Sequence, residues 1–385
     1  MIKRCFNRIY SPQPCNTGRQ FELDVFRFIL IYRLAVVHVF VDASPPAALD
    51  TLGVPYYFDS IVGGVIGAPR FMIMMGIGLA YSTHSAPQLL FKRGLKLGAV
   101  GLLLNVFRYL IPSFIGYWIT GDAAHYLKPL PYLFFGNDIL QFAALAMLLM
   151  ALLLYLKLTP GKIFLIALGL SILGTIFRSV DCQNTVLNIV LSHFVGVETV
   201  SGEPFIYSDF PLITWFIFYA FGYIFGHFYR HIKDKKAFYL LVSPICLVIA
   251  VAFCTWEIVG GFGMMMGEGD NVFYHMHTIE AFICIIACVG TLIVSYALSL
   301  VIPASWRKPI TMVSRNVNAI YCIHWVLVWW TVDLALYCIK GDPYLSPLPA
   351  YLLGLVLSIV SMLLAHAWSQ FKIKLKRKKG YEKKG

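Results

Sequence analysis

Charged residues are scarce in this chain, and their scarcity excludes the largest class of proteins. Only 13% of the 385 residues are charged and 59% are hydrophobic, which gives a mean hydropathy of +0.74. A water-soluble protein of this length carries far more polar residues. We therefore expect an all-α polytopic membrane protein.

Three further patterns are missing. Nine cysteines are present, but no spacing among them is typical of a metal site or a disulfide framework, so we expect no metal. Motif-scale internal repeats are absent as well, which disfavours a transporter built from inverted halves. Residues 1–20 are polar and basic and lack the apolar core of a signal peptide, so we expect the first membrane segment to stay attached as an anchor.

Apolar stretches long enough to cross about 30 Å of hydrocarbon recur along the chain. They lie at residues 23–41, 60–82, 93–111, 138–157, 162–179, 211–230, 238–257, 277–301, 316–339 and 348–370. This pattern predicts about ten transmembrane helices in one bundle over residues 23–370. Tails at 1–22 and 371–385 flank the bundle, and long connections at 112–137 and 180–210 interrupt it. Within the second connection, residues 184–197 fit a short interfacial helix.

The net charge of +12 does not indicate a nucleic-acid partner, because the basic residues gather at the ends of the apolar segments. If the amino terminus is cytoplasmic, nearly all basic clusters fall on the cytoplasmic side and most acidic residues on the other. We therefore expect both termini to be cytoplasmic, in an integral protein of a bacterial inner membrane. The basic tail at 371–385 would then bind anionic lipid headgroups.

Two ionisable residues, Arg27 and His38, lie eleven positions apart in the first apolar segment. On an α-helix, eleven residues at about 100° each return to the same face, with an offset of about 20° and a rise of about 16 Å. One face of a membrane helix then holds a cation and an imidazole at different depths. Because a charge near the bilayer centre costs about 2.5 kcal/mol or more, the pair is a candidate functional site.

Neighbouring carboxylates offer alternative interpretations of this pair. Asp24 lies three residues before Arg27, so an ion pair at the cytoplasmic interface also accounts for the arginine. Asp42 lies four residues after His38 and is placed to orient one ring nitrogen, which leaves the other as a general base. A lone histidine near a helix end is usually structural, but these neighbours favour catalysis. We predict His38, Asp42 and Arg27 as catalytic residues.

A second group of polar residues begins the ninth segment. Ser314, Asn318, Tyr321 and His324 recur at intervals of four, three and three residues, which predicts one polar stripe on an otherwise apolar helix. In a membrane, such a stripe faces protein or water. It is equally typical of interhelical hydrogen bonding that holds a bundle together and of contacts to an acceptor or a transition state.

Basic residues are candidates for binding the phosphates of a substrate that enters from the cytoplasm. Arg70 lies near the middle of the second segment, where it needs a buried anion or water. The other candidates lie at cytoplasmic ends, where the positive-inside rule also accounts for them: Lys92, Arg93, Arg307 and Arg315. Glycines between Gly63 and Gly78 are typical of close helix packing. Arg108, near the end of the third segment, fits a side chain that snorkels to the interface.

These residues resemble signatures of the transmembrane acyltransferase superfamily, which contains the acyltransferase-3 proteins and relatives of heparan-α-glucosaminide N-acetyltransferase. The first-helix signature has a Leu-Asp pair, an Arg three residues past that Asp, and a His after ten intervening residues, and it is matched by Leu23, Asp24, Arg27 and His38. The late Ser, Tyr and His signature resembles Ser314, Tyr321 and His324. Two other stretches, 68–78 and 137–141, are more similar to the glucosaminide branch.

The resemblance implies a membrane enzyme that moves an acyl group, often acetyl, from cytoplasmic acyl-CoA to a hydroxyl or amine of a glycan or glycolipid on the far side. Arg27 would line the path of the donor, and His38 would act as base or as transient acyl carrier. Tyr321 or His324 would contact the oxyanion or the acceptor. The chain departs from the acyltransferase-3 pattern at Phe28, where glycine is usual. The rival hypothesis is a transporter or flippase for a glycan or lipid-linked precursor, with the buried histidine as a proton relay.

Overall fold

The computed structural model describes residues 8–50, 54–197, 199–200, 203–204, 208–260 and 273–382. The first seven and last three residues of the two predicted tails, and part of the 180–210 connection, therefore lie outside the described residues. Within the described part the protein is helical, apart from one antiparallel pair of two-residue strands, β1 (Thr199–Val200) and β2 (Glu203–Pro204).

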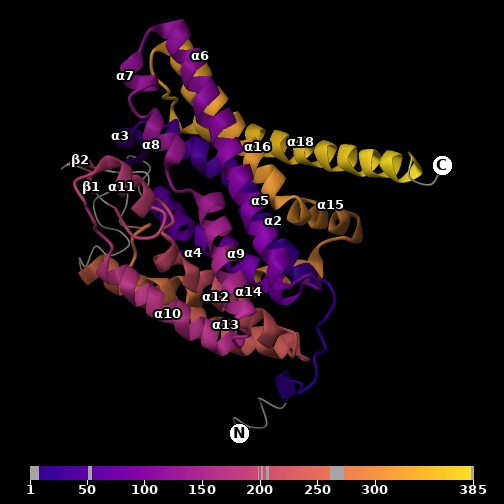
Figure 1. Cartoon of the computed structure of the whole chain (residues 1–385). Coiled ribbons are helices and arrows are strands. Elements are labelled where there is room, and N and C mark those ends of the chain that lie inside the picture. Colours follow the sequence, from indigo (N-terminus) through magenta and orange to yellow (C-terminus); the bar gives the residue numbers. More distant parts are fainter. Residues whose placement is uncertain are drawn as a thin grey trace. The chain divides into compact units, whose positions relative to one another are not determined.

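The elements follow one another along the chain as Figure 1 labels them. The first nine helical elements are α2 (Phe21–Asp42), α3 (Pro46–Asp50), α4 (Val54–Ala80), α5 (Pro87–Asn105), η1 (Val106–Leu110), α6 (Ile111–Thr120), α7 (Ala123–Tyr126), α8 (Leu130–Phe135) and α9 (Ile139–Tyr155). The others are α10 (Pro160–Ile176), α11 (Thr185–Leu191), α12 (Leu212–Tyr229), α13 (Lys235–Gly260), α14 (Thr278–Val301), α15 (Ala304–Arg315), α16 (Val317–Trp329), η2 (Trp330–Leu336), α17 (Tyr337–Lys340) and α18 (Pro347–Glu382).

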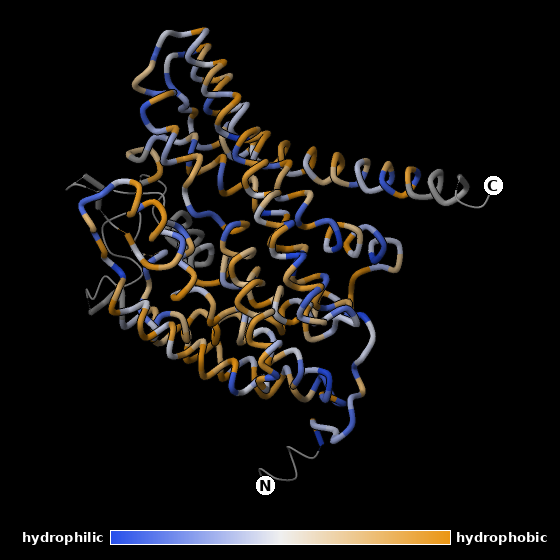
Figure 2. The backbone as a smooth tube through the Cα atoms, in the orientation of Figure 1, coloured by the Kyte–Doolittle hydropathy of each residue, from blue (hydrophilic) through white to orange (hydrophobic). Residues whose placement is uncertain are grey.

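Apolar helices of membrane-spanning length dominate the described residues. Six are long and apolar enough to cross a bilayer: 87–120, 212–229, 235–256, 278–301, 317–340 and 347–375. Figure 2 shows hydrophobic residues along most of these helices. Each of the ten predicted segments overlaps a helix, but α9, α10 and the apolar part of α4 are shorter. The helix α2 contains Arg27 and Arg33 within its apolar stretch. The protein is thus all-helical with six candidate spans, and the count of ten is not confirmed.

Two compact units divide the chain, and their segments alternate along it. Unit 1 comprises residues 1–20, 59–103 and 131–294, and unit 2 comprises residues 21–58, 104–130 and 295–385. Each unit is built from segments far apart in the sequence, whereas the sequence pattern predicts one bundle. All catalytic residues predicted from the first helix belong to unit 2.

Close approach of α4 and α12 organises unit 1. A Cβ atom added to Gly76 would lie 2.2 Å from the carbonyl oxygen of Tyr219, and one added to Gly222 would lie 2.0 Å from that of Ile73. Both separations are far below van der Waals contact, so the two helices reach this distance only through paired glycines. The predicted role of the α4 glycines in packing is confirmed for Gly76, whereas a Cβ at Gly63 or Gly67 would meet nothing within 4 Å in the described part of the chain.

In unit 2, α2 packs against α15, α16 and α18. The long helix α18 approaches α2 closely where Gly354 faces Val36, and Ser358 Oγ donates a hydrogen bond of 2.7 Å to the Tyr32 carbonyl oxygen. These contacts bury one side of α2 against three helices. The position of α2 at the centre of unit 2 determines where its ionisable residues lie.

Two π-helical turns of unit 2 lie within long continuous helices, which we call rods, and they overturn one expectation. The turn η1 joins α5 to α6, so the rod continues to Thr120 and residues 112–137 are not one long loop. The missing N–H of Pro112 is tolerated because this residue lies in the first turn of α6, directly after η1. The turn η2 lies between α16 and α17 in the second rod. Its first residue, Trp330, donates a hydrogen bond from Nε1 to the Phe107 carbonyl oxygen of η1 at 2.8 Å.

Candidate active site in unit 2

The first functional residues are placed by a single uninterrupted helix. Residues 21–42 form α2 throughout, so Arg27 and His38 share a helix face about 16 Å apart along its axis, as their spacing predicts. Both side chains are half-buried, whereas Asp42, at the carboxyl end of α2, is exposed. The helix therefore presents a cation, an imidazole and a carboxylate in succession along its length.

His38 lies against aromatic residues of α16. Its ring centroid is 4.0 Å from the Trp325 ring and 5.6 Å from the His324 ring. The His324 ring in turn lies 5.2 Å from the Tyr321 ring at an interplanar angle of 66°. The structure thus joins the two sequence motifs, because the histidine of the first helix meets the tyrosine and histidine of the late motif.

Arg108 of η1 completes this group of residues, and its interpretation as an interfacial snorkel is wrong. Its side chain is buried, and its guanidinium carbon lies 3.4 Å from the centroid of the Trp325 ring and 4.4 Å from that of Tyr109. A cation over an aromatic face is attracted by the ring quadrupole, most strongly when desolvated. The rod continues past Arg108 into α6, so the residue lies far from a helix end. We call His38, Arg108, Tyr321, His324 and Trp325 the histidine cluster.

Two buried nitrogens in the histidine cluster lack hydrogen-bond partners among the described residues. His324 is 1% exposed, and its Nδ1 approaches the Ile320 carbonyl oxygen at 3.3 Å while its Nε2 has no partner in this part of the chain. Trp325 Nε1 is also buried and also has no hydrogen-bond partner among the described residues. Buried polar atoms are nearly always hydrogen-bonded, and each exception needs an explanation such as strain, a catalytic role or a bound molecule. Such atoms also occur elsewhere in the described part of the chain, at His227 and His366. The histidine cluster is a candidate site because two of them lie beside His38 and Arg108.

The late motif is not one helical stripe. Ser314 lies in the last turn of α15, and α16 begins only at Val317, because the chain leaves helical geometry at Asn316. The Ser314 hydroxyl donates to Asp24 Oδ1 at 2.7 Å, and the Thr311 hydroxyl donates to the other carboxylate oxygen at 3.2 Å. Ser314 therefore ties α15 to α2. It lies apart from the histidine cluster, and this location favours the structural alternative for this residue.

Asn318 is also separate from the stripe, since its side chain is exposed whereas Tyr321 and His324 are buried. The break at Asn316 separates only Ser314, because Asn318 lies on α16 with the other two residues. Two successive intervals of three residues turn Asn318 about 120° away from His324 around the helix. Of the four residues in the predicted stripe, only Tyr321 and His324 join His38.

The predicted phosphate-binding residues fall into both units. In unit 1, Lys92 and Arg93 are exposed near the start of α5, whereas Arg70 is buried within α4 and its Nη2 lies 3.2 Å from Thr291 Oγ1. Arg70 precedes the end of α4 by ten residues, or about 15 Å along the helix. It therefore lies well inside the helix rather than beside the α4–α5 loop.

In unit 2, Arg307 and Arg315 are exposed on α15. Ile310 and Val313 are the buried residues of this amphipathic helix, and Trp306 is largely exposed. The Arg307 guanidinium lies 5.0 Å from the Phe21 ring at the start of α2. The two arginines thus form a basic surface at the same end of α2 as Arg27.

A family comparison covers nearly the whole of this architecture. The model described as an acyltransferase domain, of the acyltransferase-3 type, matches residues 20–367. The chain belongs to the acyltransferase-3 family. This confirms the family inferred from the sequence motifs, and it makes the protein a membrane acyltransferase by family. No curated protein and no solved structure matches the chain.

Within this acyltransferase, sequence reasoning missed two members of the histidine cluster. Arg108 was placed at a helix end because the third apolar segment was taken to end at residue 111, and Trp325 was one aromatic residue among several. The signal that could identify them is an arginine in an apolar segment that continues beyond it, from Ile111 to Ile119, together with a tryptophan directly after His324. The roles of His38, Asp42 and Arg27 in catalysis stay predictions.

Proposed function

We propose that this acyltransferase moves an acyl group, most simply acetyl, from cytoplasmic acyl-CoA to a hydroxyl of a glycan or glycolipid across the membrane. The observation that carries the proposal is the contact of His38 with His324 and Trp325, at the motif of the acyltransferase-3 family. A partly accessible imidazole beside a buried cation and a second imidazole is suited to acid–base chemistry.

In this mechanism, His38 accepts the proton of the acceptor hydroxyl as the oxygen attacks the thioester carbonyl carbon. A carbon–oxygen bond forms, the carbon–sulfur bond breaks, and His38 returns the proton to the leaving CoA thiolate. Arg108 lies over Trp325, against which His38 packs, and its charge stabilises the oxyanion. His324 Nε2 contacts the same oxygen or the acceptor.

The donor enters at the opposite end of α2. Arg307 and Arg315 are exposed at the end that carries Arg27, where guanidinium groups suit the diphosphate of CoA. A pantetheine arm would then run past Arg27 towards His38. Both termini are cytoplasmic in this proposal, and the acceptor approaches from the outer side of a bacterial inner membrane. Lys92, Arg93 and Arg70 of unit 1 are further candidates for donor binding.

The proposal is tested by His38→Ala in purified full-length protein reconstituted in lipid. Loss of a general base typically lowers the rate by about 10² to 10⁴-fold, so we expect acetyl-CoA turnover, measured by CoA thiol release, to fall by at least about 100-fold. His84→Ala is the matched control, because His84 is an exposed histidine in a loop of unit 1.

The outcome that rejects the assignment is equal turnover in His38→Ala and the wild type. A second arm replaces Arg307 and Arg315 by Gln. This variant should raise the KM for acetyl-CoA with little change in kcat, because the substitutions remove charge that acts on bound phosphate. An unchanged KM would assign both arginines to membrane topology alone.

A further inference from the structure

A second histidine of unit 2 is held in place with one nitrogen accessible. In the short helix α7, which follows α6, His125 Nε2 lies 3.2 Å from Oδ1 of Asp333 in η2. The His125 ring stacks on the Tyr337 ring at 3.7 Å between centroids and 7° between planes. About a quarter of each polar side chain is exposed, 27% for His125 and 21% for Asp333. We call Asp122, His125, Asp333 and Tyr337 the α7 site.

Hydrogen bonds among the residues around His125 hold its imidazole in place. The Tyr337 hydroxyl donates to Asp122 Oδ2 at 2.7 Å, and the other Asp122 oxygen accepts the backbone N–H of His125 at 3.0 Å. Tyr126, next to His125, donates its hydroxyl to the Asp333 carbonyl oxygen at 3.1 Å. Asp122 therefore anchors both the short helix α7 and the ring on which His125 stacks. So many restraints on one side chain preorganise it for binding.

The hydrogen bond to Asp333 fixes the chemistry of the remaining nitrogen. With Nε2–H donating to the carboxylate, Nδ1 carries the lone pair and accepts a hydrogen bond. Among the described residues, no group donates to Nδ1. In contrast, His277 of unit 1 uses both of its ring nitrogens, one towards Arg178 and one towards Glu280. In His125, Nε2 contacts Asp333 and the ring stacks on Tyr337, whereas Nδ1 has no hydrogen-bond partner among the described residues.

The α7 site is electrostatically connected to the end of α2. Asp42, which ends α2 four residues after His38, lies within electrostatic range of Arg108, which attracts its carboxylate, and of Asp333, which repels it. Asp333 follows His324 by nine residues on the same rod, which is about 14 Å along a helix. The α7 site thus lies beyond the histidine cluster, towards the end of unit 2 at which α2 finishes.

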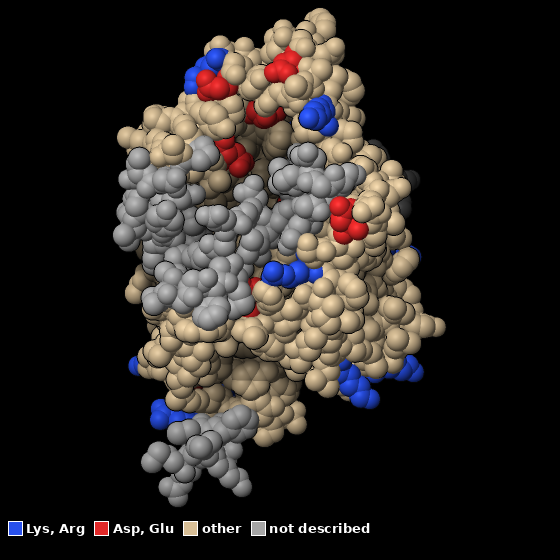
Figure 3. Space-filling view, turned by 90° about the vertical axis from the view of Figure 1, so that its left-hand side faces the viewer, with Lys and Arg blue, Asp and Glu red and all other residues tan. Residues whose placement is uncertain are grey.

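The charge of this region defines the ligand. Asp333 contacts the His125 ring and Asp122 binds the Tyr337 hydroxyl beside it, whereas the lysines of this region are Lys128, two residues after α7, and Lys340, which ends α17 and pairs with Asp342. On the face shown in Figure 3, most of the visible Asp and Glu lie in the upper half, the level at which α6 and α7 lie in Figure 1, and Lys or Arg side chains lie among them. Carboxylates repel phosphate and carboxylate groups, whereas they accept hydrogen bonds from hydroxyls.

We propose that the α7 site is an acceptor subsite, in which His125 Nδ1 accepts a hydrogen bond from a hydroxyl of a neutral sugar and the surrounding carboxylates exclude anionic sugars. The proposal rests on the acyl-transfer function above and adds the residues that select the acceptor. His125 is a binding residue here, and His38 remains the base.

The test measures binding of methyl β-D-glucopyranoside to the full-length protein in phosphatidylcholine nanodiscs. Binding is monitored by saturation-transfer NMR in the absence of acetyl-CoA. The key variant is His125→Gln. Its side-chain amide keeps a donor near the Nε2 position for Asp333 but removes the Nδ1 acceptor. Loss of one hydrogen bond should weaken binding about tenfold. His84→Gln is the control and should bind as the wild type does.

Two additional arms keep the test decisive. Methyl β-D-glucuronide, which differs by a carboxylate, should bind at least about tenfold more weakly than the glucoside to the wild type. Tyr337→Phe keeps the stacked ring but releases Asp122, and it should weaken glucoside binding about threefold, which supports the site even if His125→Gln fails to fold. With acetyl-CoA present, His125→Gln should raise the KM for the glucoside and leave the KM for acetyl-CoA unchanged.

The proposal is overturned by equal binding of glucoside to wild type and His125→Gln, by equal binding of glucoside and glucuronide, or by absence of glucoside binding to the wild type. Its failure is separable from failure of the proposed function. Glucoside binding without acetyl transfer supports the subsite and rejects the transfer reaction, whereas CoA release that depends on His38 but not on this sugar does the reverse.

Discussion

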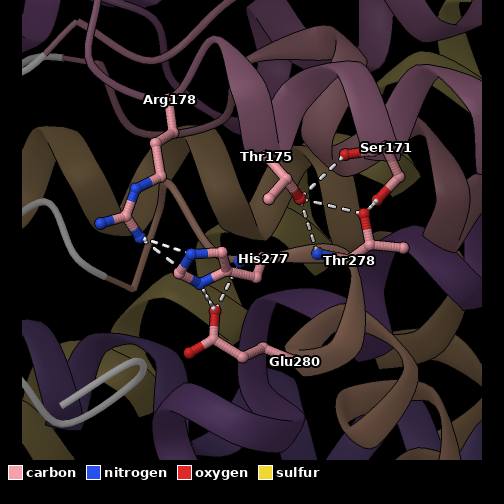
Figure 4. A network of polar contacts seen from close by, with 6 residues as sticks. All are labelled: Ser171, Thr175, Arg178, His277, Thr278 and Glu280. Atoms are coloured by element: carbon pink, nitrogen blue, oxygen red, sulfur yellow. Dashed lines mark hydrogen bonds and ion pairs between the residues drawn. The ribbon is translucent and has the colours of Figure 1, made fainter. Parts of the chain in front are cut away.

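Two polar clusters, one in each unit, use the same residue types in opposite ways. In unit 1, Ser171, Thr175, Arg178, His277, Thr278 and Glu280 form the network shown in Figure 4. Arg178 Nη1 contacts His277 Nε2 at 2.9 Å, and His277 Nδ1 lies 3.3 Å from Glu280 Oε2. Both nitrogens of this histidine are occupied. In the histidine cluster of unit 2, His324 Nε2 has no hydrogen-bond partner among the described residues.

The unit 1 network accepts the free N–H groups at the start of α14. The Thr278 N–H donates to Thr175 Oγ1 at 2.9 Å, and Glu280 accepts the N–H of His277. These are N–H groups that a helix start leaves without intrahelical partners, and a Glu three residues inside the helix is typical of a capping box. The comparison separates His277, whose two nitrogens are occupied in a helix-capping network, from His324, whose Nε2 has no hydrogen-bond partner in the described part of the chain. Only the second histidine is a candidate for function.

Replacing Trp325 should give the largest effect. Trp325 carries the ring against which both His38 and Arg108 pack, so Trp325→Ala displaces two groups at once. Displacement by about 1 Å costs about 100-fold in rate, and we expect at least that loss in CoA release per folded molecule. Trp325→Phe, which keeps an aromatic face, should retain activity within about tenfold. Wild-type rates in Trp325→Ala would show that the histidine cluster does not position the base.

Replacing Glu280 should lower stability and leave activity nearly unchanged. Its carboxylate is fully buried and caps α14, so Glu280→Ala should lower the free energy of unfolding by about 1–3 kcal/mol. Glu280→Gln, which keeps an accepting oxygen, should cost less. Unfolding in SDS-containing micelles measures the loss, and CoA release by the folded fraction should stay within about threefold of wild type. A loss of turnover with unchanged stability would place unit 1 in the reaction.

Lowering the pH should give the smallest effect. Burial, and then the neighbouring Arg178 guanidinium, hold the pKa of His277 below its usual range. The unfolded chain gains a proton as the pH falls through about 6.5, whereas the folded chain stays neutral there. The stabilising contribution of His277 is therefore complete above that pH and is lost progressively below it. The midpoint temperature of thermal unfolding should fall as the pH is lowered from about 7.5 to about 5.5. This fall should be smaller in His277→Gln than in the wild type.

Much of the protein follows from sequence because the relevant physics is local. Eleven residues of uninterrupted helix place Arg27 and His38 on one face, the glycines of α4 permit close packing, and Asn184 begins the short helix α11 by accepting the Leu187 N–H. The apolar composition predicts an all-helical membrane protein, and the motif spacing identifies its family. Each of these inferences depends on residues within a few turns of one another.

The tertiary structure decided which of these residues act together. The π-turn before Pro112 carries the rod onward, Arg108 within it is buried, and the break at Asn316 separates Ser314 from the helix that holds His324. The pairing of His125 with Asp333 spans 208 positions, so no periodicity reports it. Helical geometry determines which residues share a face of one helix. Only the packing of distant segments into a unit determines which faces meet, because that depends on the shape of every side chain between them.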